Sequence, residues 1–206
     1  MPVVSHEVFT LFAEPYFRAN IAGSISPQQI AFIQNLKMVD NPENMISENL
    51  YIFEEPELES VKDAIQEILD IYARDVLCIP QQLYVTQSWS LICKSNMGMH
   101  SHSHSNSILS GSLYYCELPT PPAGMIFTRY DSYQQIDLPP DTQKRNIYNS
   151  PINRVVPQQN DVLLFSSRLT HMVEQNQSGQ PRYSIAFNTF VKGTLGNQRA
   201  VTELKL

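Results

Sequence analysis

Apolar side chains recur at three- and four-residue steps between residues 55 and 77, which predicts one long amphipathic helix with a single buried stripe. The stripe consists of Leu58, Val61, Ile65, Ile68, Leu69, Tyr72 and Val76. A shorter helix is expected after Ser26, because Ser is a favoured N-cap and Pro27 suits the first helical position. The long helix is expected to pack its apolar stripe on a sheet.

The pattern changes after Pro80 into short runs rich in Val, Ile, Tyr, Phe and Thr, separated by Pro, Gly, Asn or Ser. This rhythm predicts a mostly β protein, an antiparallel sandwich or barrel with its helices near the N-terminus. The Phe-rich segment "EVFTLFAEPYF" can supply one further strand. We expect a single domain over residues 1–206, with a strand and helices in 1–80, the β core in 81–193 and a C-terminal tail in 194–206.

The segment from residue 131 to residue 157 is long, polar and contains four prolines. A loop of this length inside a compact domain is usually a lid or a binding loop. We therefore predict that residues 131–157 form a lid over a site.

Composition excludes several classes of protein. The chain is 42% hydrophobic and 17% charged, with a formal net charge of -6, so it is globular and has no basic cluster suited to direct nucleic-acid binding. Three cysteines without a CxxC spacing argue against a disulfide scaffold and a Cys-rich zinc site. No apolar run approaches the roughly 18 residues of a membrane span, so a cytoplasmic protein without a membrane partner is expected.

Histidine is rare in this chain, and three of its five histidines are His100, His102 and His104. On a strand, residues two apart point the same way, so His102 and His104 would present two imidazoles from one face. Imidazole is a common ligand for Fe, Zn, Cu and Ni. The pair could equally be His100 and His102, because the sequence does not fix the register, and a solvated Ser/His turn that binds nothing is the plain alternative.

A second feature lies further along the chain. His171 follows an apolar run at 161–165, and Arg182 comes eleven residues later inside another apolar run, "PRYSIAFNTF". An antiparallel hairpin would bring Arg182 back near His171. A buried guanidinium needs a partner, which is either a core Asp or Glu or the carboxylate of a ligand.

Taken together, "MHSHSHSNSILSGSLYY", "FSSRLTH" and "RYSIAFN" resemble the iron(II)/2-oxoglutarate-dependent oxygenases. They are most similar to the bacterial and phage family with HxHxxxxxSG…YY, FxxxLxH and RxSxxFN segments. The resemblance covers roughly residues 87–191. It implies a double-stranded β-helix, a cupin-like jelly roll with N-terminal helices packed on the outside.

The resemblance also implies roles for individual residues. His102, His104 and His171 would bind Fe(II), and Arg182 with Ser184 would hold the far carboxylate of the cosubstrate 2-oxoglutarate. His104 departs from the wider superfamily, in which this position is often Asp or Glu, and no carboxylate occurs from residue 88 to residue 116. A third neutral imidazole would hold Fe(II) less tightly.

Two neighbouring tyrosines, Tyr114 and Tyr115, alternate along an expected strand, so one of them should face the interior of the barrel. We assign Tyr115 as the one that hydrogen-bonds the cosubstrate, with a core position as the alternative. His100 is kept as an alternative metal ligand.

The resemblance thus implies a dioxygenase that hydroxylates a small molecule or a protein side chain and releases succinate and CO2. One alternative is a non-catalytic structural or binding module on the same scaffold, such as a phage virion component in a homo-oligomer or larger assembly. Another is a cupin-type three-His metalloprotein, although no Glu follows His104 at short spacing and a cupin has no need of Arg182. A phage-encoded enzyme would act in the host cytoplasm, and the structural module would sit in the virion.

Overall fold

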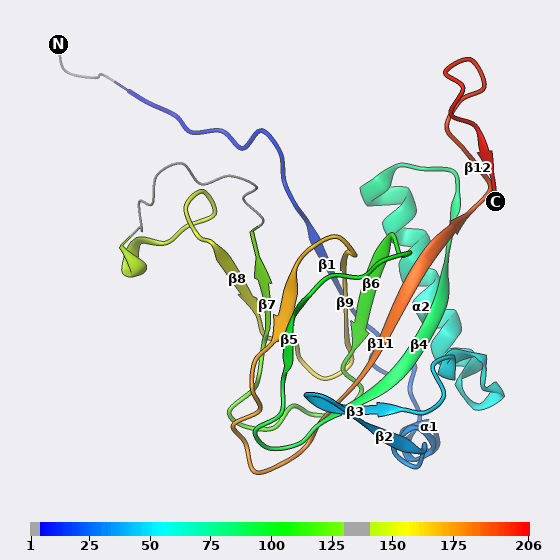
Figure 1. Cartoon of the computed structure of the whole chain (residues 1–206), viewed down its shortest axis with the longest axis vertical. Coiled ribbons are helices and arrows are strands. Elements are labelled where there is room, and N and C mark those ends of the chain that lie inside the picture. Colours follow the sequence, from blue (N-terminus) through cyan, green and yellow to red (C-terminus); the bar gives the residue numbers. More distant parts are fainter. Residues whose placement is uncertain (1–4, 130–140) are drawn as a thin grey trace.

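A computed structural model describes residues 5–129 and 141–206 of the protein. Of the predicted lid, residues 131–140 therefore lie outside the described part. Within the described residues, no helix is long and apolar enough to cross a membrane. The framework is a pair of facing antiparallel sheets (Figure 1).

The strands of the larger sheet are, in chain order, β1 (Tyr16–Asn20), β2 (Met38–Asn41), β3 (Asn44–Ser47), β4 (Gln82–Cys93), β6 (Leu109–Leu113), β9 (Asp161–Ser166) and β11 (Arg182–Lys192). They pair in the order β1-β9-β6-β11-β4-β3-β2. The strands of the smaller sheet are β5 (Met99–His102), β7 (Met125–Thr128), β8 (Ile152–Val155) and β10 (His171–Val173). They pair in the order β5-β10-β7-β8.

From β4 to β11 the chain passes repeatedly from one sheet to the other, which is the topology of a double-stranded β-helix. The expected jelly-roll fold is thereby confirmed. The expected hairpin between the strands of His171 and Arg182 is wrong, because β10 pairs with β5 and β7 whereas β11 pairs with β4 and β6. The buried Asn176 holds the connecting loop in its crossing path, since its amide donates to the carbonyls of Cys93 and Gln180.

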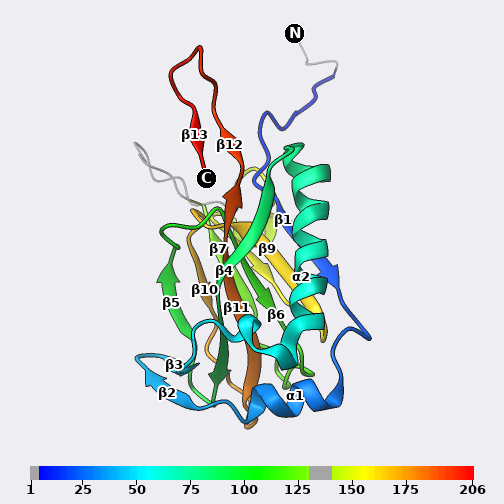
Figure 2. The ribbon, with the colours of Figure 1, turned by 90° about the vertical axis from the view of Figure 1, so that its right-hand side faces the viewer.

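Both expected helices are present. Helix α1 (Pro27–Gln34) begins with a reciprocal capping box between Ser26 and Gln29, which satisfies two backbone N–H groups at its start. The long helix is α2 (Glu59–Tyr72), preceded by two short 3-10 turns, Ile52–Glu54 and Pro56–Leu58, and continued by a π turn, Ala73–Leu77. Helix α2 lies along one face of the larger sheet (Figure 2).

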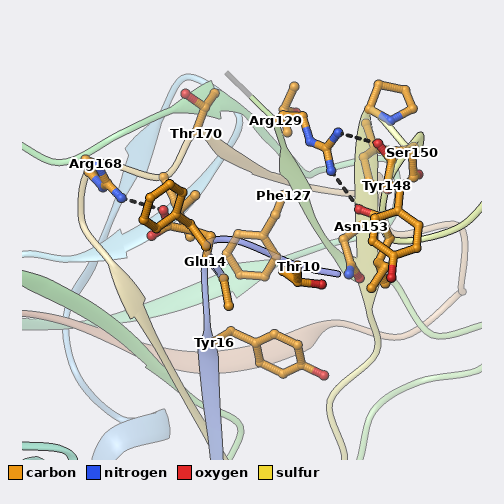
Figure 3. Close-up of a pocket in the computed structure, with 17 residues that line it drawn as sticks. Thr10, Glu14, Tyr16, Phe127, Arg129, Tyr148, Ser150, Asn153, Arg168 and Thr170 are labelled. Atoms are coloured by element: carbon orange, nitrogen blue, oxygen red, sulfur yellow. Dashed lines mark hydrogen bonds and ion pairs between the residues drawn. The ribbon is translucent and has the colours of Figure 1, made fainter. Parts of the chain in front are cut away.

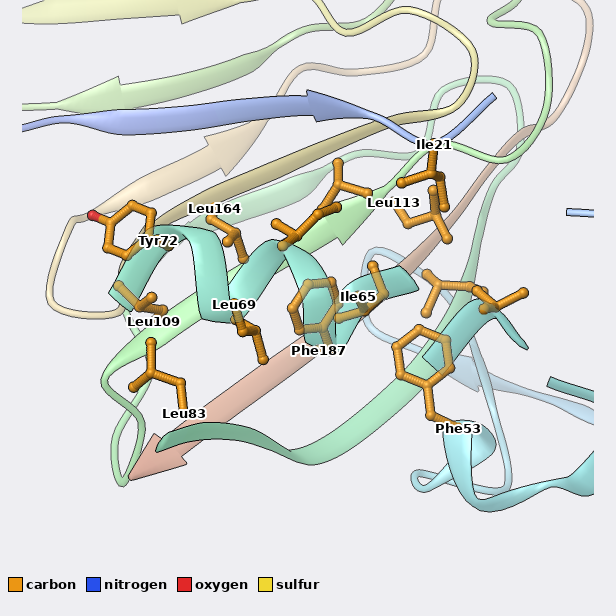
Figure 4. Packing of buried hydrophobic residues seen from close by; sticks show 14 of the residues in the cluster. Ile21, Phe53, Ile65, Leu69, Tyr72, Leu83, Leu109, Leu113, Leu164 and Phe187 are labelled. Atoms are coloured by element: carbon orange, nitrogen blue, oxygen red, sulfur yellow. The ribbon is translucent and has the colours of Figure 1, made fainter. Parts of the chain in front are cut away.

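The main core lies between α2 and the larger sheet (Figure 4). Its stripe residues Val61, Ile65 and Leu69 are fully buried, and each such side chain contributes about 1.5–3 kcal/mol through burial. In the larger sheet, the ring of Phe187 on β11 packs directly over Gly111 on the adjacent strand β6. A Cβ at position 111 would lie 2.1 Å from that ring, so only glycine fits there.

Three expectations about chain segments need correction. Of "EVFTLFAEPYF", only Tyr16 and Phe17 belong to β1, and residues 5–15 form no regular element. The expected C-terminal tail instead forms a projecting hairpin of β12 (Thr194–Leu195) and β13 (Leu204–Lys205) (Figure 1). The segment 131–157 is not loop throughout, since it contains β8.

Candidate active site

Three histidines from two parts of the chain meet at one end of the smaller sheet. His102 is the last residue of β5 and lies directly opposite His171, the first residue of β10. His104 follows two residues after β5, where its backbone N–H donates to the carbonyl of Ser167 at 2.9 Å. The possible ligand atoms of the three imidazoles all lie within 4.8 Å of one another. Alternation along a strand does not explain this arrangement, because β5 ends at His102 and a loop turns His104 inward.

Backbone carbonyls fix which ring nitrogen is available in two of these histidines. Nδ1 of His102 lies 2.8 Å from the carbonyl oxygen of His100, and Nδ1 of His171 lies 2.9 Å from that of Leu169. A carbonyl only accepts, so each Nδ1 carries the hydrogen and each Nε2 keeps its lone pair. Nε2 of His104 lies 3.4 Å from Nε2 of His171. A hydrogen bond from Nδ1 to a backbone carbonyl, which leaves Nε2 free, is the arrangement that orients metal-binding imidazoles in proteins.

The electrostatic environment keeps two of the imidazoles uncharged. Burial, with a smaller contribution from the neighbouring His102, lowers the pKa of His104 to about 4. Burial also lowers the pKa of His171 to about 4, with His102 and His104 adding to the effect and the Leu169 hydrogen bond opposing it. At neutral pH both rings are therefore in the form that binds a metal ion.

His100, the alternative ligand, does not join the group of three. Its side chain is 56% exposed, and its Nδ1 lies 3.5 Å from the carboxylate of Glu43. Its contribution is the backbone carbonyl that orients His102. The structure thus brings together His102, His104 and His171, and leaves the ring of His100 outside.

A cavity of about 190 Å³ extends from the three histidines to Arg182 and Ser184 on β11. Both side chains are buried, with 3% of Arg182 and 1% of Ser184 exposed. Within the described residues, Nε and Nη1 of Arg182 and Oγ of Ser184 have no hydrogen-bond partner. Buried donors are rarely left unpaired because the cost is high, and a carboxylate matches the guanidinium fork. The cavity therefore fits a small anionic ligand that reaches from the histidines to Arg182.

Tyr114, and not Tyr115, lies beside the guanidinium. The Cζ atom of Arg182 is 5.5 Å from the centre of the Tyr114 ring, and the buried Tyr114 hydroxyl also lacks a partner among the described residues. Tyr115 belongs to the cluster packed under α2, 6.3 Å from the Tyr183 ring, where burial raises its pKa. The Tyr115 hydroxyl likewise has no hydrogen-bond partner among the described residues. The tyrosine on the side of Arg182 is Tyr114, and both tyrosines follow the end of β6 at Leu113. A role of Tyr115 toward the cosubstrate stays a prediction.

One wall of the cavity is formed by alternate residues of β4, Trp89, Leu91 and Cys93. Cys93 is directly opposite Arg182 in the β4–β11 ladder, and the rings of Trp89 and His104 lie 6.4 Å apart. Cys93 was not among the residues predicted for the site. The signal that could have found it is its place in the alternating series Trp89, Leu91 and Cys93.

Three serines, Ser107, Ser110 and Ser167, form what we call the serine clamp. Their hydroxyls form a chain, with Ser110 2.9 Å from Ser167 and Ser167 donating to Ser107 at 2.7 Å. The Ser110 hydroxyl donates its hydrogen to Oδ1 of Asn188 at 2.9 Å. Since the backbone carbonyl of Ser167 accepts from the backbone N–H of His104, the clamp ties the His104 loop to the turn before His171.

The fold and the site define a jelly-roll protein with three histidines that could hold a metal ion at one end of a cavity and a buried arginine at the other. Residues 87–188 match the family described as "Putative 2OG-Fe(II) oxygenase". This segment contains the three histidines, Arg182 and Ser184, so the match to the oxygenase family coincides with the candidate site. No curated protein matches the chain.

Solved structures with a similar fold include several oxygenases. An oxidoreductase of the 2OG-Fe(II) oxygenase family from Burkholderia pseudomallei has a TM-score of 0.60 at 10% identity, covering 84% of this chain and 83% of that one. HygX from Streptomyces hygroscopicus, with nickel, 2-oxoglutarate and hygromycin B bound, has a TM-score of 0.60 at 12% identity, covering 85% and 82%. The epimerase SnoN from nogalamycin biosynthesis has a TM-score of 0.59 at 12% identity, covering 86% and 78%. At these identities the likeness establishes the fold.

Proposed function

We propose that the protein is an Fe(II)- and 2-oxoglutarate-dependent dioxygenase that hydroxylates its substrate and releases succinate and CO2. The observation that carries this proposal is one cavity that joins three imidazoles to a buried guanidinium whose Nε and Nη1 have no partner in the described part of the chain. The similar fold of HygX holds nickel and 2-oxoglutarate, and SnoN has been seen with Fe3+ and alpha-ketoglutarate.

Each end of the cavity has a distinct task. His102, His104 and His171 would hold Fe(II), which when bound supplies the redox chemistry that couples O2 reduction to decarboxylation of the cosubstrate. Arg182 would pair with the far carboxylate of 2-oxoglutarate, and Ser184 would donate its hydroxyl to the same group. The Tyr114 hydroxyl is placed to assist Arg182.

The ligand set makes the cosubstrate the source of negative charge at this site. Three imidazole ligands carry no charge, whereas a set with one carboxylate would carry one negative charge. Fe(II) and the Arg182 guanidinium would thus both be compensated by the two carboxylates of 2-oxoglutarate. We therefore expect 2-oxoglutarate to bind the metal-loaded protein much more tightly than the metal-free protein.

The test is an anaerobic titration of the metal-free protein with Fe(II) and 2-oxoglutarate, followed through the visible charge-transfer band of the chelate. The band is expected in the parent protein and should weaken in Arg182→Ala. Arg154→Ala is the matched control, because Arg154 is a surface residue paired with Glu174. Succinate formation on admission of O2 then measures turnover.

The other two outcomes of the titration each favour a different alternative function. Iron binding without a band would indicate a cupin-type three-His metal site. Neither iron nor a band would contradict the proposal and favour a retained scaffold with a structural or binding role.

A further inference from the structure

A second and larger hollow lies at the same end of the sandwich as the three histidines. We call it the N-terminal groove. It has a volume of about 800 Å³ and is lined by residues 10, 12–14, 16, 127–129, 147, 148, 150–153 and 168–170 (Figure 3). The last of these segments leads directly into His171.

An aromatic column connects the N-terminal groove to the histidines. In its floor, the rings of Tyr16 and Phe127 are stacked with their centres 6.2 Å apart. The Phe127 ring lies 5.0 Å from Phe165 and 6.2 Å from His171, and Phe165 is 4.6 Å from His171. A molecule seated on Phe127 would therefore be separated from the metal-binding residues by a single layer of side chains.

The groove gathers exposed apolar side chains from two distant parts of the chain. Phe12 is 92% exposed, Ile147 is 69% exposed and Tyr148 is 49% exposed. Contiguous exposed apolar surface is unfavourable in water and commonly marks a binding site. Polar residues at the rim do not change this character (Figure 3), since Arg168 is paired with Glu14.

The other cation of the groove is engaged with the backbone. Arg129 donates through Nη1 to the carbonyl of Tyr148 at 2.9 Å and through Nη2 to that of Ile147 at 2.8 Å. These bonds hold the two apolar side chains at the edge of the groove. The cation therefore shapes the wall, while the aromatic floor and the apolar rim supply the contact surface.

We propose that the N-terminal groove binds the substrate to be oxidised, and that this substrate has a largely apolar, ring-bearing body larger than a single amino acid. The proposal rests on the proposed function, because the groove acquires this role from the oxidising centre beside it. Its volume lies within the range of pockets that bury drug-sized ligands, and aromatic side chains favour stacking with rings. The smaller cavity is left for the metal ion and the cosubstrate.

The test uses 6-fluoro-2-naphthol as a ring-bearing probe, observed by fluorine NMR without O2 and with 2-oxoglutarate present. The protein is loaded with Co(II) in one sample and with diamagnetic Zn(II) in the other. We expect faster relaxation of the bound fluorine with Co(II), because the groove lies beside the histidines. We also expect Phe12→Asp and Ile147→Glu each to weaken probe binding at least about fivefold, because each places a charge against the ring.

Leu11→Asp is the matched control, since Leu11 is 87% exposed and lies outside the groove lining. It should leave probe binding unchanged. The proposal is overturned if neither groove variant weakens binding, if the probe does not bind, or if Co(II) has no effect on the bound fluorine. It is also overturned if light scattering shows that the groove variants split an oligomer, because the groove would then be an interface between copies of the chain.

The two proposals fail in different ways. The charge-transfer band of the parent protein reports the metal and 2-oxoglutarate alone. A band with an unresponsive probe would contradict only the groove, whereas a missing band would contradict the dioxygenase whatever the probe shows.

Discussion

Replacing Arg182 with methionine is expected to leave the ligand-free protein at least as stable as the parent while abolishing its stabilisation by 2-oxoglutarate. Most substitutions of buried residues destabilise a protein. Arg182 differs because it is a buried cation whose Nε and Nη1 groups have no acceptor among the described residues. We expect the cost of burying this cation to be offset only when the carboxylate of 2-oxoglutarate binds to it.

The magnitude follows from the contacts. Each unsatisfied buried N–H costs about 1–3 kcal/mol, and methionine removes both of them. The cation–π contact with Tyr114, at 5.5 Å from the ring centre, contributes about 0.5–2 kcal/mol in the opposite direction. Methionine keeps most of the aliphatic packing. The two N–H groups together cost about 2–6 kcal/mol, so after the loss of the cation–π contact the free energy of unfolding of the ligand-free variant should rise by about 0–5 kcal/mol.

The assay is urea unfolding of three samples of each protein: without metal or cosubstrate, with Zn(II) alone, and with Zn(II) and 2-oxoglutarate. At a ligand concentration of about 100 times Kd, the parent should gain about 2.7 kcal/mol from 2-oxoglutarate, and Arg182→Met should gain none. Arg154→Met is the control, since it removes a cation that is ion-paired with Glu174 at the surface and should keep the full gain. A loss of more than about 1 kcal/mol in ligand-free Arg182→Met would refute the reasoning, because the guanidinium would then have a partner within the protein.

Three further predictions concern the packing and the metal centre. Gly111→Ala should destabilise the protein by about 1–3 kcal/mol in urea unfolding, because its Cβ would lie 2.1 Å from the Phe187 ring, and adding Phe187→Leu should recover part of the loss. Ser167→Ala should weaken Zn(II) binding about tenfold in calorimetry, because the Ser167 hydroxyl fixes the turn whose backbone carbonyl accepts from the His104 N–H; unchanged affinity would contradict that role. The metal-free protein should lose stability as pH falls from 6.5 toward 4, because His104 and His171 have lowered pKa values and the unfolded chain binds the protons first; a flat profile in thermal unfolding would contradict this.

The sequence predicted the elements of this fold well where the signal was local. The apolar stripe of α2 and the alternating runs of β4 to β11 are properties of neighbouring residues, so they are visible without tertiary structure. Pairing is not local. The expected hairpin failed because an alternating pattern does not say which sheet a strand joins, and the Asn176 bonds that send the chain across the sandwich depend on a carbonyl 83 residues away.

The sequence predicted which residues make up the candidate site better than it predicted how they are arranged. The sequence identified His102, His171 and Arg182 as members of one site, but for a reason that holds only in part, since the strand ends before His104. The choice between Tyr114 and Tyr115 depended on how the chain leaves β6, because the strand ends at Leu113 and its alternation does not extend to the two tyrosines. The groove residues Phe12 and Ile147 were invisible as a group, because only the folded chain places the two segments side by side.

The histidines and the anchor for the anion belong to different layers of the sandwich. His102 and His171 lie on the smaller sheet, whereas Arg182 and Ser184 lie on β11, which is held on both sides by β4 and β6 in the larger sheet. A substitution at His102 or His171 thus leaves the strand pairing that positions Arg182 in place. A change of metal would then alter the affinity for the cosubstrate through the metal ion itself, while the distance between the two layers sets the length of the anion that can span them.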